Sequence, residues 1–108
     1  MYNDAPANQP AYMLLMSGTP GTNPTMYQQS SPISYVNAAT SPTIIIQGGL
    51  DPVVNATTQS LALKNKLVSF GVVNDYVFYP TGGHGDWNTA TYTDAFNKVQ
   101  AFLATNVP

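Results

Sequence analysis

Two short runs of β-branched and aromatic residues predict strands in the second half of the chain. The first, Thr43 to Gln47, contains three consecutive isoleucines without polar alternation, which is typical of a strand buried on both faces of a parallel sheet. The second, Asp75 to Tyr79, is rich in aromatic residues and favours a strand by composition. Gly48-Gly49 follow the first run and Pro80 follows the second, so each predicted strand leads directly into a loop.

A helix with one apolar face is expected after each strand. Asn55 is expected to cap a helix that ends at about residue 70, where Gly71 suits the position just beyond a helix end. A second helix is expected from about residue 91 to residue 104. The apolar face of the first helix would carry Leu63, Leu67 and Phe70, and that of the second Tyr92, Phe96, Val99 and Leu103.

The resulting order of strand, helix, strand and helix indicates the α/β class with a parallel sheet, in a domain spanning residues 43–108. Residues 1–42 are rich in Pro, Asn, Ser, Thr and Gly and predict an irregular connector with short helical pieces. One piece is expected at residues 11–16. Another is expected after Asn23-Pro24, with Asn23 as its cap and Pro24 in its first turn, ending before Ser31-Pro32. A disordered linker is the alternative, although the scattered tyrosines, methionines and leucines favour a loop that packs against other parts of a protein.

Charge and composition exclude several functions. The chain has three lysines, five aspartates, no Arg and no Glu, for a net charge of -2. It therefore offers almost no surface that neutralises phosphates, and we expect no nucleic-acid partner. No apolar run approaches the ~20 residues of a membrane span, and no charged segment precedes an apolar stretch as in a signal peptide. The chain has no cysteine, which excludes disulfides and thiolate metal sites, and no metal or cofactor is expected.

Two ionisable residues follow the two predicted strands. Asp51 lies in the loop after the first strand, and His84 lies in the glycine-rich loop after the second. Loops that leave parallel strands at the same edge of a sheet are the usual place for ligands, and neighbouring strands are only ~4.8 Å apart. An aspartate that holds the Nδ1–H of a histidine leaves Nε2 free to accept a proton from a nucleophile. The pair therefore predicts the acid and base of a catalytic triad.

Each residue also has an ordinary structural interpretation. An aspartate before a proline at a strand end commonly forms an Asx turn or caps a helix, as Asp51 would before Pro52. A histidine between glycines, such as His84, is often a plain surface residue. Together on successive strand ends, the two residues weaken both ordinary interpretations.

The chain resembles a known family in three places. Residues 31–36 read S-P-I-S-Y-V, residues 43–54 read T-I-I-I-Q-G-G-L-D-P-V-V, and residues 76–85 read Y-V-F-Y-P-T-G-G-H-G. These segments are similar to the C-terminal third of α/β-hydrolase esterases, in the branch of bacterial carboxylesterases and lipases that includes feruloyl- and acetyl-esterase-like proteins. The resemblance implies that Asp51 is the triad acid and His84 the triad base, in the order Ser, acid, His along the chain.

The family's nucleophile motif, G-x-S-x-G, does not occur in these 108 residues. The segment that comes closest to this motif is Met16-Ser17-Gly18. No strand–turn–helix pattern surrounds Ser17, so it is expected to be an ordinary loop serine. The resemblance therefore implies the C-terminal part of a serine esterase or lipase whose nucleophile lies elsewhere, so that this chain alone is inactive. It also implies that residues 18–27 belong to an insert that caps the substrate pocket. Residues 12–16 are candidates to line a lid over that pocket, with ordinary loop packing as the alternative.

Two further interpretations of function remain open. The domain could be a non-catalytic structural or interaction module, or part of a serine peptidase of the prolyl-oligopeptidase type, which shares this pattern. Trp87 follows the histidine loop and is a candidate substrate contact, with packing against the start of the last helix as the alternative. Two parallel strands alone leave both sheet edges unpaired, so we expect self-association through those edges.

Overall fold

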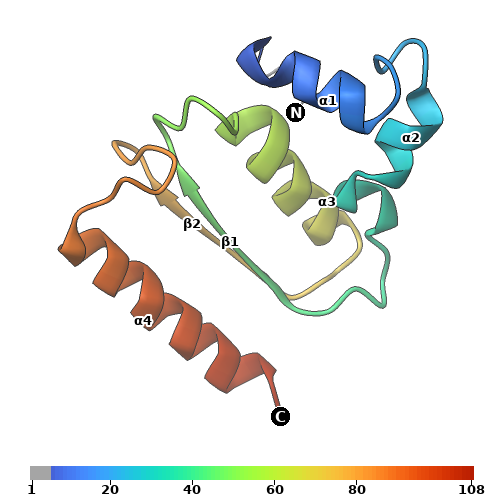
Figure 1. Ribbon diagram of the computed structural model, residues 1–108. Helices are drawn as coiled ribbons and strands as arrows, with labels where there is room; N and C mark the ends of the chain where they lie inside the picture. Colours follow the sequence, from blue (N-terminus) through green and yellow to red (C-terminus); the bar gives the residue numbers. More distant parts are fainter. Residues whose placement is uncertain (1–5) are drawn as a thin grey trace.

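A two-stranded parallel sheet forms the centre of the chain in the computed structural model, which describes residues 6–108 (Figure 1). The strands are β1 (Thr43–Gly48) and β2 (Asn74–Tyr79), paired in a register that places Ile46 beside Val77. Both predicted strands are thus confirmed to within one residue at each end. The first five residues of the predicted irregular segment lie outside the described residues.

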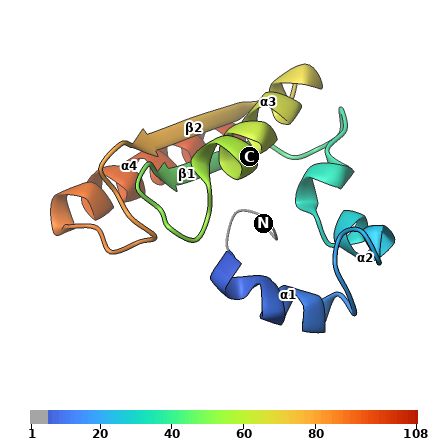
Figure 2. The same cartoon turned by 90° about the horizontal axis from the view of Figure 1, so that it is seen from above.

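Two helices cover opposite faces of this sheet (Figures 1 and 2). Residues 56–61 form a wide π-helical turn, η3 (Ala56–Leu61), that continues into α3 (Ala62–Ser69) on one face. The other face carries α4 (Thr89–Asn106). The order β1, α3, β2, α4 is the predicted one, and it confirms the α/β class with a parallel sheet.

The side chains at the ends of the helices explain their limits. The Oδ1 atom of Asn55 accepts hydrogen bonds from the backbone N–H groups of Thr57 and Thr58, as expected for an N-cap. Gly71 has a φ of 68°, and the N–H of Val72 reaches back to the carbonyl of Leu67 at 3.0 Å. This is the Schellman arrangement, in which a glycine takes a left-handed conformation at no steric cost.

The core lies between α3 and the sheet. Leu67, Val72 and Val36 are buried there, and Ile45 and Leu63 pack against them. Leu67 and Val72 also form the apolar contact that accompanies a Schellman motif. The helix end and the core are therefore built from the same two residues.

The predicted apolar faces are partly wrong. Phe70 is exposed, and its ring lies beneath the ammonium group of Lys66. On α4 three residues of the predicted stripe, Tyr92, Phe96 and Leu103, are also exposed, with Phe96 63% accessible. The fourth, Val99, is half-buried, and the buried side of the helix continues from it to Ala95 and Phe102. Because Ala95 is small, it allows the helix backbone to approach the sheet closely.

Short helices make up most of the described N-terminal segment, as expected. They are η1 (Pro6–Asn8), α1 (Gln9–Leu15), α2 (Pro24–Gln29) and η2 (Pro32–Tyr35). They lie on the α3 side of the sheet, away from α4 (Figures 1 and 2). Among residues 6–108, no helix has the length and apolar character needed to cross a membrane.

The predicted capping role of Asn23 is wrong. Pro24 does occupy the first turn of α2, but the Asn23 side chain makes no capping bond to it. Instead, Nδ2 of Asn23 donates to the carbonyl oxygen of Met16 at 2.8 Å. The side chain therefore joins the start of α2 to the end of α1.

Candidate active site

The loops that follow β1 and β2 are bound to each other at the carboxyl edge of the sheet. The N–H of Gly49 donates to the carbonyl of Tyr79 at 2.8 Å, and the N–H of Leu50 donates to that of Gly82 at 2.9 Å. A Cβ atom at Gly48 would lie 2.2 Å from the carbonyl oxygen of Gly83. The close approach of the two loops therefore requires glycine at the end of β1.

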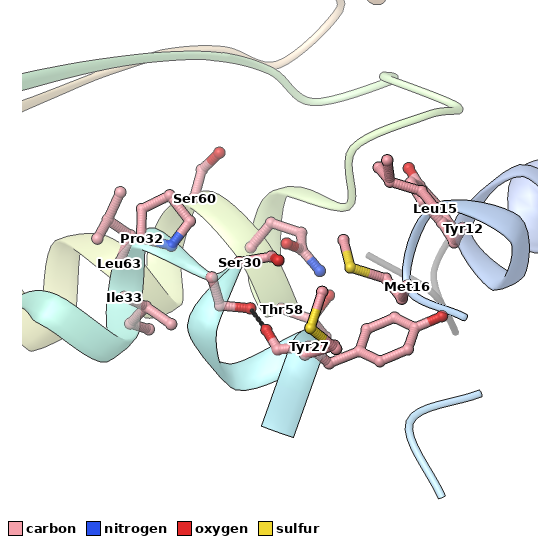
Figure 3. Close-up of a pocket in the computed structure, with 13 residues that line it drawn as sticks. Tyr12, Leu15, Met16, Tyr27, Ser30, Pro32, Ile33, Thr58, Ser60 and Leu63 are labelled. Carbon is pink, nitrogen blue, oxygen red and sulfur yellow. Dashed lines mark hydrogen bonds between the residues drawn. The ribbon is translucent and has the colours of Figure 1, made fainter. Parts of the chain in front are cut away.

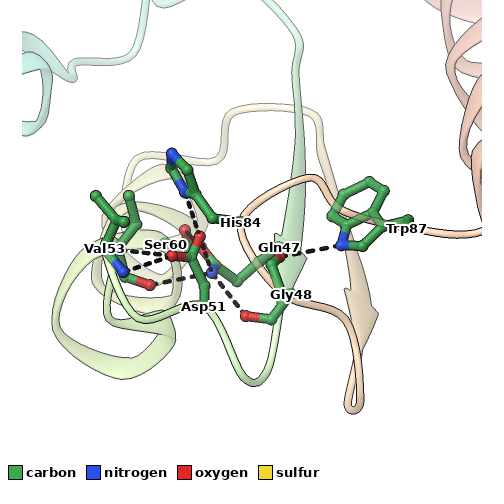
Figure 4. A network of polar contacts seen from close by, with 9 residues as sticks. Gln47, Gly48, Asp51, Val53, Ser60, His84 and Trp87 are labelled. Carbon is green, nitrogen blue, oxygen red and sulfur yellow. Dashed lines mark hydrogen bonds and ion pairs between the residues drawn. The ribbon is translucent and has the colours of Figure 1, made fainter.

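This approach brings the two predicted site residues together. The Nδ1 atom of His84 lies 2.9 Å from Oδ2 of Asp51 (Figure 4). The side chain of Asp51 is 8% accessible, whereas that of His84 is 56% accessible. The other ring nitrogen of His84, Nε2, points away from Asp51. A histidine held at Nδ1 and open at Nε2 has the geometry of a general base.

The second carboxylate oxygen of Asp51 is held by the backbone. Oδ1 accepts hydrogen bonds of 2.8 Å from the N–H groups of both Val53 and Val54. Burial alone would raise the pKa of Asp51, but the bonds from Val54, His84 and Val53 outweigh it, so the pKa of this carboxyl is lowered from its ordinary value. The aspartate therefore forms the Asx-type turn that its position before Pro52 predicts, and it contacts His84 as well.

Gly85 contributes to the shape of the histidine loop. Its φ of 102° is in a region that favours glycine, and its carbonyl accepts a hydrogen bond from the hydroxyl of Tyr92 on α4. Gly83, on the other side of His84, does not have a positive φ. A Cβ there would lie 2.1 Å from Oδ1 of Asp86, the end of an exposed side chain that can turn away, so Gly83 is not required by this contact.

A buried glutamine extends the polar contacts beneath Asp51. The side chain of Gln47 is bonded to the carbonyls of Gly48 and Val54 and lies 3.5 Å from Oδ2 of Asp51, and it accepts a bond from the hydroxyl of Ser60 (Figure 4). Sequence reasoning missed this residue. A polar side chain that closes a run of three isoleucines is the signal that points to it.

Trp87 packs at the start of α4. Its ring lies 5.3 Å from that of Tyr79 and 5.5 Å from that of Tyr92, and its Nε1 donates to the carbonyl of Gly83 at 3.0 Å. The indole lies on the opposite side of the end of β1 from the His84 ring and points away from it (Figure 4). These contacts match the packing alternative, and a substrate contact by Trp87 stays a prediction.

A cavity of about 630 Å³ separates the N-terminal segment from η3 and α3 (Figure 3). Apolar side chains from α1, α2, η2 and α3 line most of it. Among them are Leu15, Met16, Met26, Ile33 and Leu63, with Tyr12 and Tyr27. The segment predicted to line a lid thus contributes Tyr12, Leu15 and Met16, and Ser60 lies on the opposite wall.

Ser17 has no features of a nucleophile in this structure. Its φ is 54°, and it is followed by Gly18, whose N–H donates to the carbonyl of Met13 at 2.8 Å. Ser17 therefore takes the left-handed position just beyond the end of α1 that a Schellman motif requires. Across residues 6–108, no three histidine, aspartate or glutamate side chains group closely enough to hold a metal ion.

Comparison with known proteins places the chain in a family. A family model named BD-FAE matches residues 1–67, which is more than half of the chain and includes Asp51. A solved structure titled as a truncated form of a carbohydrate esterase from gut microbiota matches with a TM-score of 0.67 and 29% sequence identity. That match covers 79% of this chain and 30% of the other, so the chain spans less than a third of that protein. The comparison with curated proteins gives no match. The chain belongs to the BD-FAE family, which is an α/β-hydrolase-type esterase family.

Proposed function

We propose that this chain supplies the acid and the base of a serine esterase, Asp51 and His84. The 2.9 Å contact between Oδ2 of Asp51 and Nδ1 of His84 carries the proposal. Burial of the aspartate and exposure of the imidazole support it, because the acid of a triad is shielded while the base must reach the substrate. Membership of an esterase family supports ester hydrolysis as the reaction.

The proposed reaction is acyl transfer in two steps. A serine outside these 108 residues attacks the ester carbonyl, and Nε2 of His84 takes the proton of its hydroxyl. The same Nε2 then gives that proton to the leaving alcohol, and an acyl-enzyme remains. In the second step Nε2 takes a proton from water as the water attacks the acyl-enzyme. It then gives that proton to the serine oxygen, and the carboxylic acid is released. Throughout, Asp51 holds Nδ1–H and stabilises the imidazolium that forms.

The chain alone is proposed to be inactive. It contains no G-x-S-x-G motif, and Ser17 occupies a helix-end position instead of a strand–turn–helix elbow. The oxyanion hole of α/β-hydrolases uses the N–H after the nucleophile and another from an early loop, so it would also come from outside the chain. The acid and base therefore have no group to activate within these residues.

The proposed substrates are carboxylic esters of carbohydrates. The carbohydrate esterase that matches the fold supports the alcohol portion. The apolar cavity of about 630 Å³ supports the acyl portion, because α1, α2 and η2 would form a lid that shields it from water. Ser60 lines this cavity and is bonded to Gln47, which lies beside Asp51, so the cavity wall is continuous with the site.

A phosphonate probe that labels activated serines tests the mechanism. Here the full-length protein means the proposed longer esterase that contains this chain. We expect the probe to label the full-length protein and to leave the 108-residue chain unlabelled. We expect no labelling of a His84→Ala form of the full-length protein. Hydrolysis of an acetylated oligosaccharide beside a simple alkyl acetate then tests the substrate class. A full-length protein without any labelled serine would favour the non-catalytic module, and labelling with cleavage of peptides instead of esters would favour the peptidase.

A further inference from the structure

One buried polar side chain links η3 to the loop that carries Asp51. Among residues 6–108, Gln47 is the buried residue with a polar or charged side chain, at 3% accessibility. It closes β1 after three isoleucines and points to the α3 face, as Ile45 does two residues earlier. A buried amide is costly unless it is fully bonded, so its partners show what it does there.

The orientation of the Gln47 amide is fixed by chemistry. Nε2 is surrounded by acceptors, namely the carbonyls of Gly48 at 2.8 Å and Val54 at 3.2 Å and the Oδ2 atom of Asp51 at 3.5 Å. The Oε1 atom faces the hydroxyl of Ser60, which donates to it. Rotation of the amide by 180° would set Oε1 against three acceptors. These three acceptors therefore direct Nε2 at the loop, and the hydroxyl of Ser60 satisfies Oε1 on the other side of the amide.

The two bonds from Nε2 hold both ends of that loop. Gly48 is the last residue of β1, and Val54 is the residue whose N–H donates to Oδ1 of Asp51 at 2.8 Å. The peptide units on either side of Val54 are thus bonded to Gln47 and to Asp51. A shift of the loop backbone that carried Asp51 away from His84 would therefore strain the bonds from Gln47.

We propose that Gln47 is a positioning residue that sets the carboxylate of Asp51 against His84, with Ser60 satisfying the oxygen of its amide. The catalytic consequence rests on the proposed function, whereas the geometric one does not. Gln47 touches neither the substrate nor the reacting atoms in this arrangement, so it acts through Asp51. Such supporting hydrogen bonds commonly decide how well a catalytic pair is oriented.

The histidine ring of the chain itself gives the most direct test. His84 is the single histidine of the sequence, so ¹⁵N NMR of a ring-labelled chain reports its tautomer without overlap. We expect the wild-type chain to show a slowly exchanging Nδ1–H signal. We expect Gln47→Leu, which removes the donor and keeps the volume, to weaken that signal at least tenfold and to populate the Nε2–H form.

Gln47→Glu should have a larger effect than Gln47→Leu, because a carboxylate there would face two carbonyls and Asp51. Ser60→Ala should have a smaller effect in the same direction. Val77→Ala is the matched control, since Val77 is also buried in the sheet but faces α4. It should lower stability and leave the tautomer unchanged.

A folded Gln47→Leu chain with an unchanged Nδ1–H signal would overturn the proposal. If Gln47→Leu does not fold, Ser60→Ala decides, and a wild-type signal in that variant would also overturn it. In the full-length protein, Gln47→Leu should lower kcat at least tenfold with little change in KM. A change in the tautomer together with a full-length protein that hydrolyses no ester would leave the positioning intact and refute the esterase function.

Discussion

Asp51 and His84 are 33 residues apart in the chain, yet Oδ2 of the first lies 2.9 Å from Nδ1 of the second. The contact depends on backbone bonds between two loops, such as that from Gly49 N–H to the carbonyl of Tyr79. It also depends on a strand end that has no Cβ, at Gly48. The acid is buried and the base exposed, so the pair combines a fixed carboxylate with an accessible ring.

The lowered pKa of Asp51 predicts a loss of stability in acid. The carboxylate is favoured in the folded chain, so its contribution is present above the ordinary pKa of 3.8 and is lost as pH falls through the lower folded value. Asp51→Asn should therefore destabilise the chain at pH 7, by about 1–3 kcal/mol, and less as the pH falls below 3.8 towards pH 3. Urea unfolding of both forms at the two pH values measures this. An equal difference at both would show that the charge of Asp51 contributes nothing.

Gly48→Ala is predicted to separate the two loops. Its methyl group would lie 2.2 Å and 2.4 Å from the carbonyl oxygens of Gly83 and Gly82, which are backbone atoms and cannot rotate away. We expect a loss of about 1–3 kcal/mol in the free energy of unfolding and a disturbed Nδ1–H signal from His84.

Gly71→Ala is the control for that change. Its φ of 68° makes alanine unfavourable by ~1–2 kcal/mol, but nothing lies within 4 Å of the added methyl group. It should therefore lower stability and leave His84 unchanged. If Gly48→Ala leaves the His84 signal as it is in wild type, the close approach of the loops is not what sets the pair.

Trp87→Phe separates the two interpretations of Trp87. Phenylalanine keeps a ring between Tyr79 and Tyr92 but removes the bond from Nε1 to the carbonyl of Gly83. If Trp87 only packs, the variant should lose about 1 kcal/mol of stability, and the full-length protein should keep its KM. A KM raised tenfold with unchanged stability would instead make Trp87 a substrate contact.

Self-association of the isolated chain remains a prediction. Within residues 6–108 the sheet has two strands, so the outer edge of each has no partner strand there. Phe96 and Leu103 add exposed apolar surface on α4. Light scattering should show a dimer or larger species whose mass rises with concentration, and Phe96→Lys separates association through α4 from association through the edges. A monomer at all concentrations would contradict the prediction.

The sequence predicted the elements that depend on local chemistry. The isoleucine run of β1, the cap at Asn55 and the helix end at Gly71 are each decided within a few residues, and each is found as expected. The loop positions of Asp51 and His84 also follow from the order of the strands. Because neighbouring parallel strands end at the same edge of a sheet, the strand order alone predicts that Asp51 and His84 lie close together.

The remaining features depend on contacts that are distant in sequence. On α4 the buried side is centred on Ala95, so Val99 is half-buried whereas Tyr92 and Phe96 of the same predicted stripe are exposed. Asn23 is bonded to Met16 instead of capping its own helix. Gln47 and Ser60 meet across 13 residues. Hydrophobic periodicity reports none of these choices, since each is settled by tertiary packing.

The most direct test is hydrolysis of p-nitrophenyl acetate and butyrate by the full-length protein and by this chain, each beside its His84→Ala form. We predict that the full-length protein is active and loses at least ~10³-fold in kcat on substitution, because the base is removed, and that the 108-residue chain is silent. A full-length protein that is inactive, or that hydrolyses both esters equally well without His84, would contradict a catalytic role for the pair and make Asp51 and His84 structural.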